Sequence, residues 1–257
     1  MKEEKLMKKT FVVNGAAHPG FGETTARMII QNGSKVIGLY EKEDKDNAER
    51  LASEFDADML DLVCIDYNSL SEVREKISLI DVEVDGFVNA CFTYEMDDLN
   101  NFDYELAETI FRANYHAPML IAVELKKKMK KGASIVIVTS TESERGSFGG
   151  VSYAASKAAV HNMIKSLACN WGKEEQIRVN AVAAGWIGGE MDTDGPFAVS
   201  IDITPLGRLG KPEEVANTVC FLLSEKASFI NAQTIFVDGG YLCVDDIAKF
   251  EYEDAKK

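Results

Sequence analysis

The chain is long enough for one large α/β domain and too acidic to favour anionic partners. It has 257 residues, of which 46% are hydrophobic, so it can bury a substantial core. A formal net charge of −14 argues against nucleic acids and anionic membrane surfaces, because binding to either needs a basic face. No apolar run reaches the ~18 residues that a membrane span needs.

The cysteines and histidines form no metal or disulfide framework in the sequence. The five cysteines are scattered and contain no CxxC motif, which favours reduced thiols in a cytoplasm. The three histidines are too far apart for a metal motif, so we expect no metal site. The charged first ten residues lack the apolar segment of a signal peptide. We therefore predict a cytoplasmic protein.

Predicted strands and helices alternate along the whole chain. Strands are expected over residues 10–13, 35–40, 59–66, 84–89, 134–139, 177–183 and 234–237. Helices are expected over residues 23–32, 42–55, 69–80, 97–129 (with a bend near Asn114 and Pro118), 153–171 and 212–223. Since no second core is evident, the alternation predicts a single doubly wound, Rossmann-like α/β domain with a parallel sheet over residues 1–257.

The first predicted strand runs into a glycine-rich turn at residues 14–22. The turn contains Gly15, Gly20, Phe21 and Gly22, and a helix follows it. Glycines let the backbone approach a pyrophosphate group, and the N-terminus of a helix stabilises its negative charge. The turn is therefore a candidate phosphate site, although an ordinary loop accounts for it about equally well.

Glu41 follows the second predicted strand, where the adenosine ribose lies in folds of this kind. A carboxylate there accepts hydrogen bonds from the ribose hydroxyls and repels a 2′-phosphate, which favours NAD(H) over NADP(H). The alternative is that Glu41 only opens the acidic segment 41–44. The residue alone does not decide between the two interpretations.

Two segments in the last third of the chain lack a clear strand or helix pattern. Residues 186–211 are rich in glycine and proline, and a loop this long often covers a binding site, so we predict a substrate-binding lid. Its apolar side chains would line a pocket or pack the lid on the body; they are Trp186, Met191, Phe197, Val199, Ile201 and Ile203. Residues 245–257 form a charged C-terminal tail, which we expect to be frayed.

Tyr153 and Lys157 are the leading candidates for catalysis. Four residues apart in a predicted helix, they place their side chains on one face. A nearby ammonium group lowers the pKa of a tyrosine, and the Ser140 hydroxyl can hydrogen-bond a substrate oxygen. Together the three groups can exchange a proton with a carbonyl oxygen. Taken alone, a Tyr–Lys pair at this spacing is more often a solvated helix face.

From about residue 10 to 242 the sequence resembles the short-chain dehydrogenase/reductase family. Ser140, Tyr153 and Lys157 match the family's Ser and Tyr-x-x-x-Lys spacing, and Asn114 matches the asparagine in its bent helix. Further matches are Asn89 in the family's Asn-Asn-Ala-Gly, Asp66 after the third strand, and the segments 177–182, 205–208 and 237–240.

The resemblance implies a role for each of these residues. Tyr153 would be the general acid/base, and Lys157 would lower its pKa and hold the nicotinamide ribose. Ser140 would orient the substrate oxygen, and Asn114 would position a water in a proton relay. The cofactor contacts would be Gly15, Gly20, Phe21, Gly22, Tyr40, Glu41, Asp66, Tyr67, Asn89, Tyr153, Lys157, Gly185 and Ile187. The implied chemistry is hydride transfer between the nicotinamide and a carbinol or carbonyl carbon.

Several positions depart from the family's pattern. The phosphate turn has one extra residue around His18, and Phe92 stands where glycine is usual. Ala184 replaces a proline, and Gly189 stands where threonine is expected. All four changes touch expected cofactor contacts and leave the catalytic residues unchanged.

The resemblance also bears on the choice of nucleotide. Members that use NADP often have a basic residue just after the second strand. This chain has Tyr40 and Glu41 there, so NAD(H) is favoured, while the neighbouring Lys42 keeps NADP(H) open.

Three functions compete. The first is an NAD(H)-dependent oxidoreductase acting on a hydrophobic or cyclic secondary alcohol, such as a hydroxysteroid, or its ketone. The second is a 3-oxoacyl-carrier-protein reductase, which the lysines of residues 126–131 favour and the net charge and residues 174–175 oppose, because carrier proteins are acidic. The third is a cofactor-binding sensor or scaffold without turnover. We expect a small-molecule substrate, neither nucleic acid nor membrane as a partner, and, by resemblance, a homotetramer.

Overall fold

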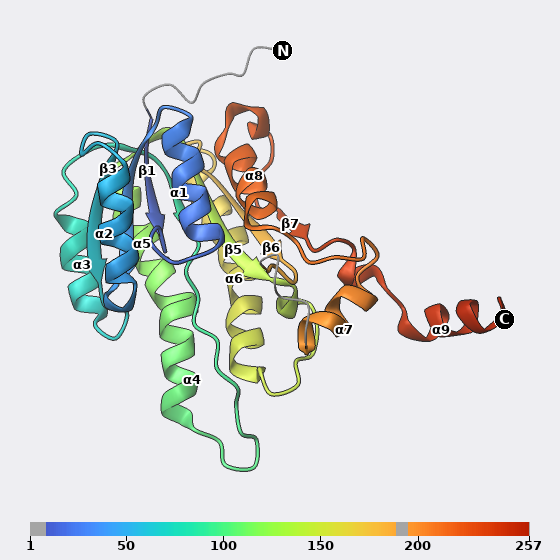
Figure 1. Cartoon of the computed structure of the whole chain (residues 1–257). Coiled ribbons are helices and arrows are strands. Elements are labelled where there is room, and N and C mark those ends of the chain that lie inside the picture. The colour runs from blue at the N-terminus through green and yellow to red at the C-terminus, as the bar shows by residue number, and fades with distance from the viewer. Residues whose placement is uncertain (1–8, 189–194, 257) are drawn as a thin grey trace.

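The computed structural model describes residues 9–188 and 195–256. Over these residues the chain forms one parallel sheet of seven strands between two layers of helices (Figure 1). The order β3-β2-β1-β4-β5-β6-β7 confirms the predicted doubly wound, Rossmann-like fold. The strands are β1 (Thr10–Asn14), β2 (Lys35–Glu41), β3 (Leu60–Ile65), β4 (Val84–Asn89), β5 (Met129–Ser140), β6 (Arg178–Ala184) and β7 (Thr234–Val237).

Each face of the sheet has its own apolar core. One core joins the sheet to α1, α2 and α8, and the other joins it to α3, α5 and α6. The central strands are buried on both faces, which explains their nearly continuous apolar sequences. The helices are α1 (Phe21–Gln31), α2 (Lys45–Glu54), α3 (Leu70–Ser78), α4 (Tyr104–Phe111), α5 (Ala117–Lys126), α6 (Val151–Trp171), α7 (Pro196–Ile203), α8 (Pro212–Leu223) and α9 (Asp246–Asp254).

The strand order reverses between β1 and β4, and this reversal places the candidate site. Asn14, at the end of β1, pairs with Asn89 at the end of β4. Asn89 pairs in turn with Ile137 of β5, and that strand continues to Ser140. Ligands of open parallel sheets bind beyond the carboxyl ends of the strands at such a reversal. The fold therefore gathers the predicted residues at one edge.

The predicted helix over residues 97–129 is wrong at both ends. α4 begins only at Tyr104. The Asp103 side chain caps this helix by accepting hydrogen bonds from the N–H groups of Glu105 and Leu106. The expected bend is a π-helical turn, Arg112–His116, and Pro118 lies in the first turn of α5, where proline is tolerated. α5 ends at Lys126, and β5 already begins at Met129.

The two segments without a predicted pattern both contain helices. The expected lid, residues 186–211, includes α7; its residues 189–194, and with them Met191 and Gly189, lie outside the described part of the chain. The tail, which we expected to be frayed, forms α9. The Lys249 Nζ of α9 donates to the carbonyl oxygen of Asp202 in α7 at 2.9 Å, so the tail contacts the predicted lid.

Two further sequence expectations can be compared with the described residues. No helix among them is long and apolar enough to cross a membrane. All five cysteines are free thiols, and only Cys91 is fully buried.

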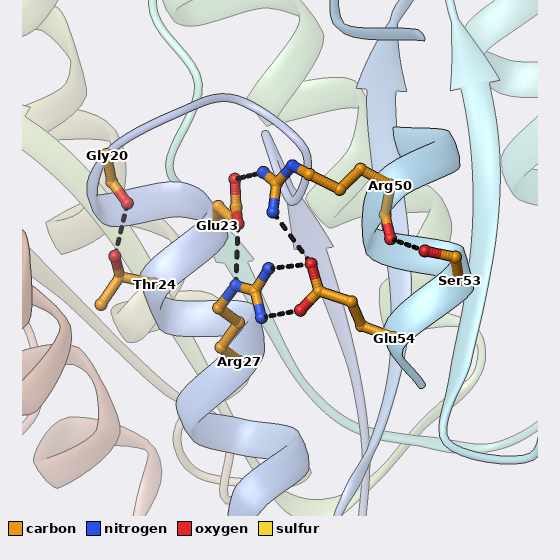
Figure 2. A network of polar contacts seen from close by, with 7 residues as sticks. All are labelled: Gly20, Glu23, Thr24, Arg27, Arg50, Ser53 and Glu54. Atoms are coloured by element: carbon orange, nitrogen blue, oxygen red, sulfur yellow. Dashed lines mark hydrogen bonds and ion pairs between the residues drawn. The ribbon is translucent and has the colours of Figure 1, made fainter. Parts of the chain in front are cut away.

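Four charged side chains join α1 to α2 in one network (Figure 2). Arg27 of α1 donates twice to Glu54 of α2, at 2.6 and 2.9 Å, and its Nε donates to Glu23 at 2.7 Å. Arg50 bridges both acids, at 3.0 Å from Glu54 and 2.7 Å from Glu23. Glu23 lies in the first turn of α1, so the network fixes the helix that begins at the glycine-rich turn.

Glu54→Gln tests this network. Hydrogen bonds from Arg27 and then from Arg50 hold the pKa of Glu54 below its ordinary value of 4.5. The ionised group therefore stabilises the fold above that pH, and the contribution is lost as the pH falls through the folded-state pKa. We expect a small fall in the unfolding midpoint at pH 7, because the group is exposed, and a difference that shrinks as the pH falls below 4.5. A difference that persists in acid would contradict the ion-pair role. Glu49→Gln, which removes only an exposed pair with Lys45, is the control.

Candidate active site

Tyr153 and Lys157 come from successive turns at the start of α6. Both side chains are buried, with 8% and 2% of the residue exposed. The Lys157 Nζ lies 5.5 Å from the centre of the Tyr153 ring and 5.6 Å from the centre of the Phe92 ring. The two side chains thus share one side of the helix, as their spacing predicts.

Burial shifts both groups toward their neutral forms. It raises the pKa of Tyr153 to about 12 and lowers the pKa of Lys157 to about 8. The expected fall in the pKa of Tyr153 is not met in this arrangement, because the cost of burying a phenolate outweighs the stabilisation it receives. At neutral pH the phenol keeps its proton, which is the form that can protonate a carbonyl oxygen.

Ser140 ends β5 and reaches the same place. Its hydroxyl oxygen accepts a hydrogen bond from the N–H of Glu142 at 3.2 Å. A hydrogen bond with Ser140 also acts to lower the pKa of Tyr153, against the larger effect of burial. The sheet edge and α6 therefore bring together a phenol, a hydroxyl and an ammonium group, which together can exchange a proton with a carbonyl oxygen.

Asn114 braces the segment that follows β4. From the π-helical turn, its Oδ1 accepts from the N–H of Thr93 at 2.8 Å. Its Nδ2 donates to the carbonyl oxygen of Thr93 at 2.9 Å and to the Ser156 hydroxyl at 3.1 Å. The side chain thereby fastens residue 93 to α6, one residue before Lys157. Its implied part in a water relay stays a prediction.

Tyr153 lies in an aromatic cluster that was not predicted from the sequence. Phe92 stacks on Phe21 of the glycine-rich turn, with 5.9 Å between ring centres, and meets Tyr153 edge-on at 6.4 Å. Tyr94 also meets Tyr153 edge-on, at 5.0 Å. The signal in the sequence was Phe92 itself, a bulky residue where the family has glycine. Its ring bounds the space between the turn and the catalytic pair.

The glycine-rich turn fits a pyrophosphate group. A Cβ on Gly22 would lie 2.3 Å from the Gly15 carbonyl oxygen, and one on Gly15, at φ +83°, would lie 3.0 Å from the backbone nitrogen of Cys91. Gly20, at φ +111°, faces open space at the N-terminus of α1. The backbone is therefore packed tightly on one side and accessible on the other, as phosphate binding at a helix N-terminus requires.

The turn accommodates its extra residue by a tight bend of the backbone near His18. The N–H of His18 closes a turn on the Gly15 carbonyl oxygen at 3.0 Å. The His18 ring lies beside the segment that follows β2, where its Nδ1 is 3.4 Å from the Asp44 carboxylate. The longer turn is thus attached to the segment that follows β2.

Acidic groups gather at the end of β2. Burial, and then the charges of Glu43, Asp44 and Asp66, raise the pKa of Glu41 to about 7. Tyr40 precedes Glu41 in β2, and Asp66 follows β3. The sheet therefore brings Tyr40, Glu41 and Asp66 to one edge, where an adenosine ribose lies in folds of this kind.

A buried chain of polar groups lies beneath the turn. The Tyr67 hydroxyl donates to Asn14 Oδ1 at 2.6 Å, and Asn14 Nδ2 donates to Asn89 Oδ1 at 2.7 Å. Asn89 Nδ2 donates to the carbonyl oxygen of Cys91 at 3.2 Å. The side chains of Tyr67 and Asn89 are thus linked through Asn14, which ties the ends of β1 and β4 to the segment that follows β3. Their expected contact with the cofactor stays a prediction.

Gly185 and Ile187 lie beyond β6. A Cβ on Gly185 would lie 2.7 Å from the Cα of Asp238, so the close crossing of the chain after β7 requires glycine there. Ile187 pairs with Gly210 in an isolated bridge, and its side chain packs on the α8 core. Both residues thus anchor the start of the expected lid.

Asp97 lies outside α4, although a helix is predicted over residues 97–129. Predicted to lie in a helix, it instead caps a different one: its carboxylate accepts from the N–H of Ser152 at 2.8 Å and from the Ser152 hydroxyl at 2.6 Å. Its own N–H donates to the carbonyl oxygen of Gly149 at 2.6 Å. The buried carboxylate therefore fixes the first turn of α6, immediately before Tyr153.

Asp97→Ala should destabilise the fold by about 2 kcal/mol, since two buried hydrogen bonds to a charged group are lost. Because the freed turn carries Tyr153, kcat should fall as well. Urea unfolding and steady-state rates measure the two effects. Asp98→Ala, which changes the exposed neighbour, is the control and should stay within about 0.5 kcal/mol of the unmodified protein. Equal stability of the two variants would show that the cap contributes nothing.

Sequence comparison places the chain in a family. Residues 15–242 match the family profile described as enoyl-(acyl carrier protein) reductase. The 3-oxoacyl-[acyl-carrier-protein] reductase FabG of Thermotoga maritima is 33% identical over 251 residues, which cover 92% of this chain and 98% of that protein. The chain belongs to the short-chain dehydrogenase/reductase family.

Solved structures agree with this assignment. BdcA in complex with NADPH is 28% identical and has a TM-score of 0.82, covering 91% of this chain and 94% of that one. A blue fluorescent protein from a metagenomic library, also in complex with NADPH, is 25% identical with a TM-score of 0.86, covering 93% and 99%.

This short-chain dehydrogenase/reductase is therefore an oxidoreductase that acts on CH–OH groups with a nucleotide cofactor. The family accounts for the position of Ser140, Tyr153 and Lys157 beside a glycine-rich turn.

Proposed function

We propose that the protein is an NAD(H)-dependent ketoreductase that interconverts a hydrophobic or cyclic ketone and its secondary alcohol. The observation that carries the proposal is the meeting of Ser140, Tyr153 and Lys157 beside the glycine-rich turn. The bound nicotinamide would supply the hydride. Tyr153 would give its proton to the carbonyl oxygen while Ser140 holds that oxygen, and Lys157 would hold the nicotinamide ribose.

The apolar surroundings of the catalytic set support a hydrophobic substrate. Tyr94 and Phe92 present rings to Tyr153. In the expected lid, Trp186 and Phe197 meet edge-on at 6.1 Å, and Trp186 is 37% exposed. Aromatic walls of this kind favour a ring or an acyl chain over a small polar substrate.

The acidic groups at the end of β2 support NAD(H) as the cofactor. A 2′-phosphate would approach Glu41 together with Glu43, Asp44 and Asp66, and all four carboxylates would repel it when ionised. Lys42 is the nearest basic residue in the chain, and it is exposed. The two structural relatives are named as NADPH complexes, so the choice of nucleotide needs a direct measurement.

A 3-oxoacyl-carrier-protein reductase is the second candidate, because FabG is among the relatives. The lysines that favoured it in the sequence lie around the start of β5, whereas Ser140 is at the other end of this strand. Three of these lysines already form ion pairs within the chain: Lys126 with Glu175, Lys127 with Glu124 and Lys130 with Asp85. They therefore give a carrier protein no docking surface near the catalytic set.

Initial rates with a substrate panel test the proposal. The panel contains cyclic ketones, a 3-oxoacyl thioester of a small thiol, and the same acyl group on a carrier protein, each with NADH and with NADPH. We expect cyclic ketones to react, and kcat/KM with NADH to exceed that with NADPH by about tenfold or more. Turnover confined to the carrier-bound substrate would favour the second candidate. A preference for NADPH that Glu41→Ala leaves unchanged would refute the role of Glu41.

We also propose a homotetramer in the cytoplasm. The assembly is supported by exposed aromatic residues that contacts between copies could bury: Tyr104 on α4, Phe221 on α8 and Phe236 on β7. Light scattering should give four times the chain mass of 28.3 kDa. A monomer at micromolar concentration would refute the assembly.

A further inference from the structure

Ser143, His161 and Glu144 form a hydrogen-bonded cluster near the C-terminal end of β5. His161 follows Lys157 by one turn on the same face of α6 and is 8% exposed. Its Nε2 lies 3.0 Å from the Ser143 hydroxyl and its Nδ1 lies 2.9 Å from the Glu144 carboxylate. The Ser143 hydroxyl also donates to the backbone carbonyl oxygen of Ser140 at 2.5 Å. The cluster therefore ends on the backbone of a catalytic residue.

The number of protons limits which of these bonds coexist. The Ser143 hydroxyl has one proton, and the Ser140 carbonyl oxygen can only accept. When Ser143 donates to that carbonyl, the Nε2 of His161 must donate to Ser143, while its Nδ1 donates to Glu144. Both ring nitrogens then carry protons, so the full set of bonds belongs to the imidazolium form. When the ring is neutral and keeps its proton on Nδ1, Nε2 can only accept a hydrogen bond. The Ser143 hydroxyl is the group placed to donate to Nε2, and it then no longer donates to the Ser140 carbonyl oxygen.

The groups around the ring set the pH at which this change in protonation occurs. Burial lowers the pKa of His161, the Glu144 carboxylate opposes it, and the positive charges of Lys165 and Lys157 add to the lowering. From β7, Phe236 presents only a ring edge at 6.4 Å. The net pKa lies below the ordinary histidine value of 6.5, so the ring is neutral at pH 7 and takes up a proton only as the pH falls through that lowered pKa.

We propose that His161 is a positioning residue that controls, through the Ser143 hydroxyl, whether the backbone of Ser140 is held at the active site. With the ring protonated, Ser143 donates to the Ser140 carbonyl and fixes the end of β5. With the ring neutral, Ser143 turns to His161 and that carbonyl loses its donor. The inference rests on the proposed role of Ser140 and gives the cluster a function in turnover.

The expected signature is in the pH profile of ketone reduction. In the unmodified protein, kcat should rise about fivefold as the pH falls through the pKa of His161, the effect of one hydrogen bond on a catalytic group. His161→Gln has no group that titrates in this range and should give a profile without this step. Ser143→Ala should also lose the step and stay at the lower level, whereas Ser143→Thr, which keeps a hydroxyl, should retain it.

Two further measurements separate this role from simple stabilisation. The chain has three histidines, so nitrogen NMR of the imidazoles can assign His161 by its loss in His161→Gln, and its titration should coincide with the kinetic step. Ser143→Ala and Ser143→Thr should differ in the pH step of kcat whether or not their unfolding midpoints differ. A step retained in Ser143→Ala or in His161→Gln would overturn the inference.

Ser140→Ala distinguishes this failure from failure of the proposed function. Should Ser140→Ala turn over normally, the role of Ser140 itself is wrong, and the present inference falls with it. Should Ser140→Ala be inactive while Ser143→Ala keeps the full pH step, only the present inference is wrong.

Discussion

Tyr153→Phe should lower kcat for ketone reduction by about 10²–10⁴-fold, the contribution that a positioned proton donor makes. The substitution removes the hydroxyl and keeps the ring, so the contacts with Phe92 and Tyr94 are preserved. The large loss is expected because Tyr153 is the group proposed to give the proton, and with a pKa of about 12 it is protonated at neutral pH. Nucleotide affinity, measured by fluorescence titration, should change by less than about threefold, since the variant loses proton transfer and not binding.

Tyr94→Phe is the matched control for this prediction. It removes the same group from a tyrosine whose ring lies 5.0 Å from that of Tyr153 but which is 48% exposed. Its kcat should stay within about threefold of the unmodified protein, because it gives no proton to the substrate. If Tyr153→Phe retained full turnover, or if the two variants lost equal activity, the assignment of Tyr153 would be wrong.

Lys157→Met should abolish turnover and at the same time stabilise the fold by up to about 3 kcal/mol at pH 7. Burial lowers the pKa of Lys157 from 10.5 to about 8, so the folded protein carries a costly buried charge at neutral pH. Methionine fills a similar volume without that charge. Urea unfolding measures the gain, and a stability equal to or below that of the unmodified protein would contradict the burial argument.

The pH dependence of this gain has a definite sign. Between about pH 8 and 10.5 the unfolded chain binds more protons at Lys157 than the folded chain does, so the unmodified protein becomes more stable as the pH rises. The advantage of Lys157→Met should therefore shrink between pH 7 and about pH 9.5, still below the ordinary tyrosine pKa. Lys165→Met, at an exposed position of the same helix, should show neither the gain nor its pH dependence.

The sheet could be predicted from the sequence because its strands are short apolar runs that end in glycine or polar residues. Asn14 and Ser140 end such runs, and the parallel order then brings their ends to one edge. The segment after β4 could not be predicted in the same way. Asp97 and Asp103 both suit a helix start, and only the tertiary fold shows that Asp97 caps α6 while Asp103 caps α4.

The sequence spacing predicted that the candidate catalytic residues lie together, but it did not predict their electrostatics. The spacing of Tyr153 and Lys157 gives a shared face, whereas the direction of each pKa shift depends on how deeply the fold buries the groups. The same holds for His161, whose partners Ser143 and Glu144 are neighbours only because β5 and α6 pack together. Burial and contacts between elements are tertiary properties, and one sequence does not display them.

Transfer of a deuterium label tests the central claim most directly. The claim is that the nucleotide gives a hydride to a carbonyl carbon while Tyr153 gives a proton to its oxygen. NADH carrying deuterium at C4, on the face from which hydride is transferred, should yield an alcohol with one deuterium on the carbinol carbon, and Tyr153→Phe should form almost none of this product. An alcohol without deuterium, or equal labelling by the Tyr153→Phe variant, would contradict the account.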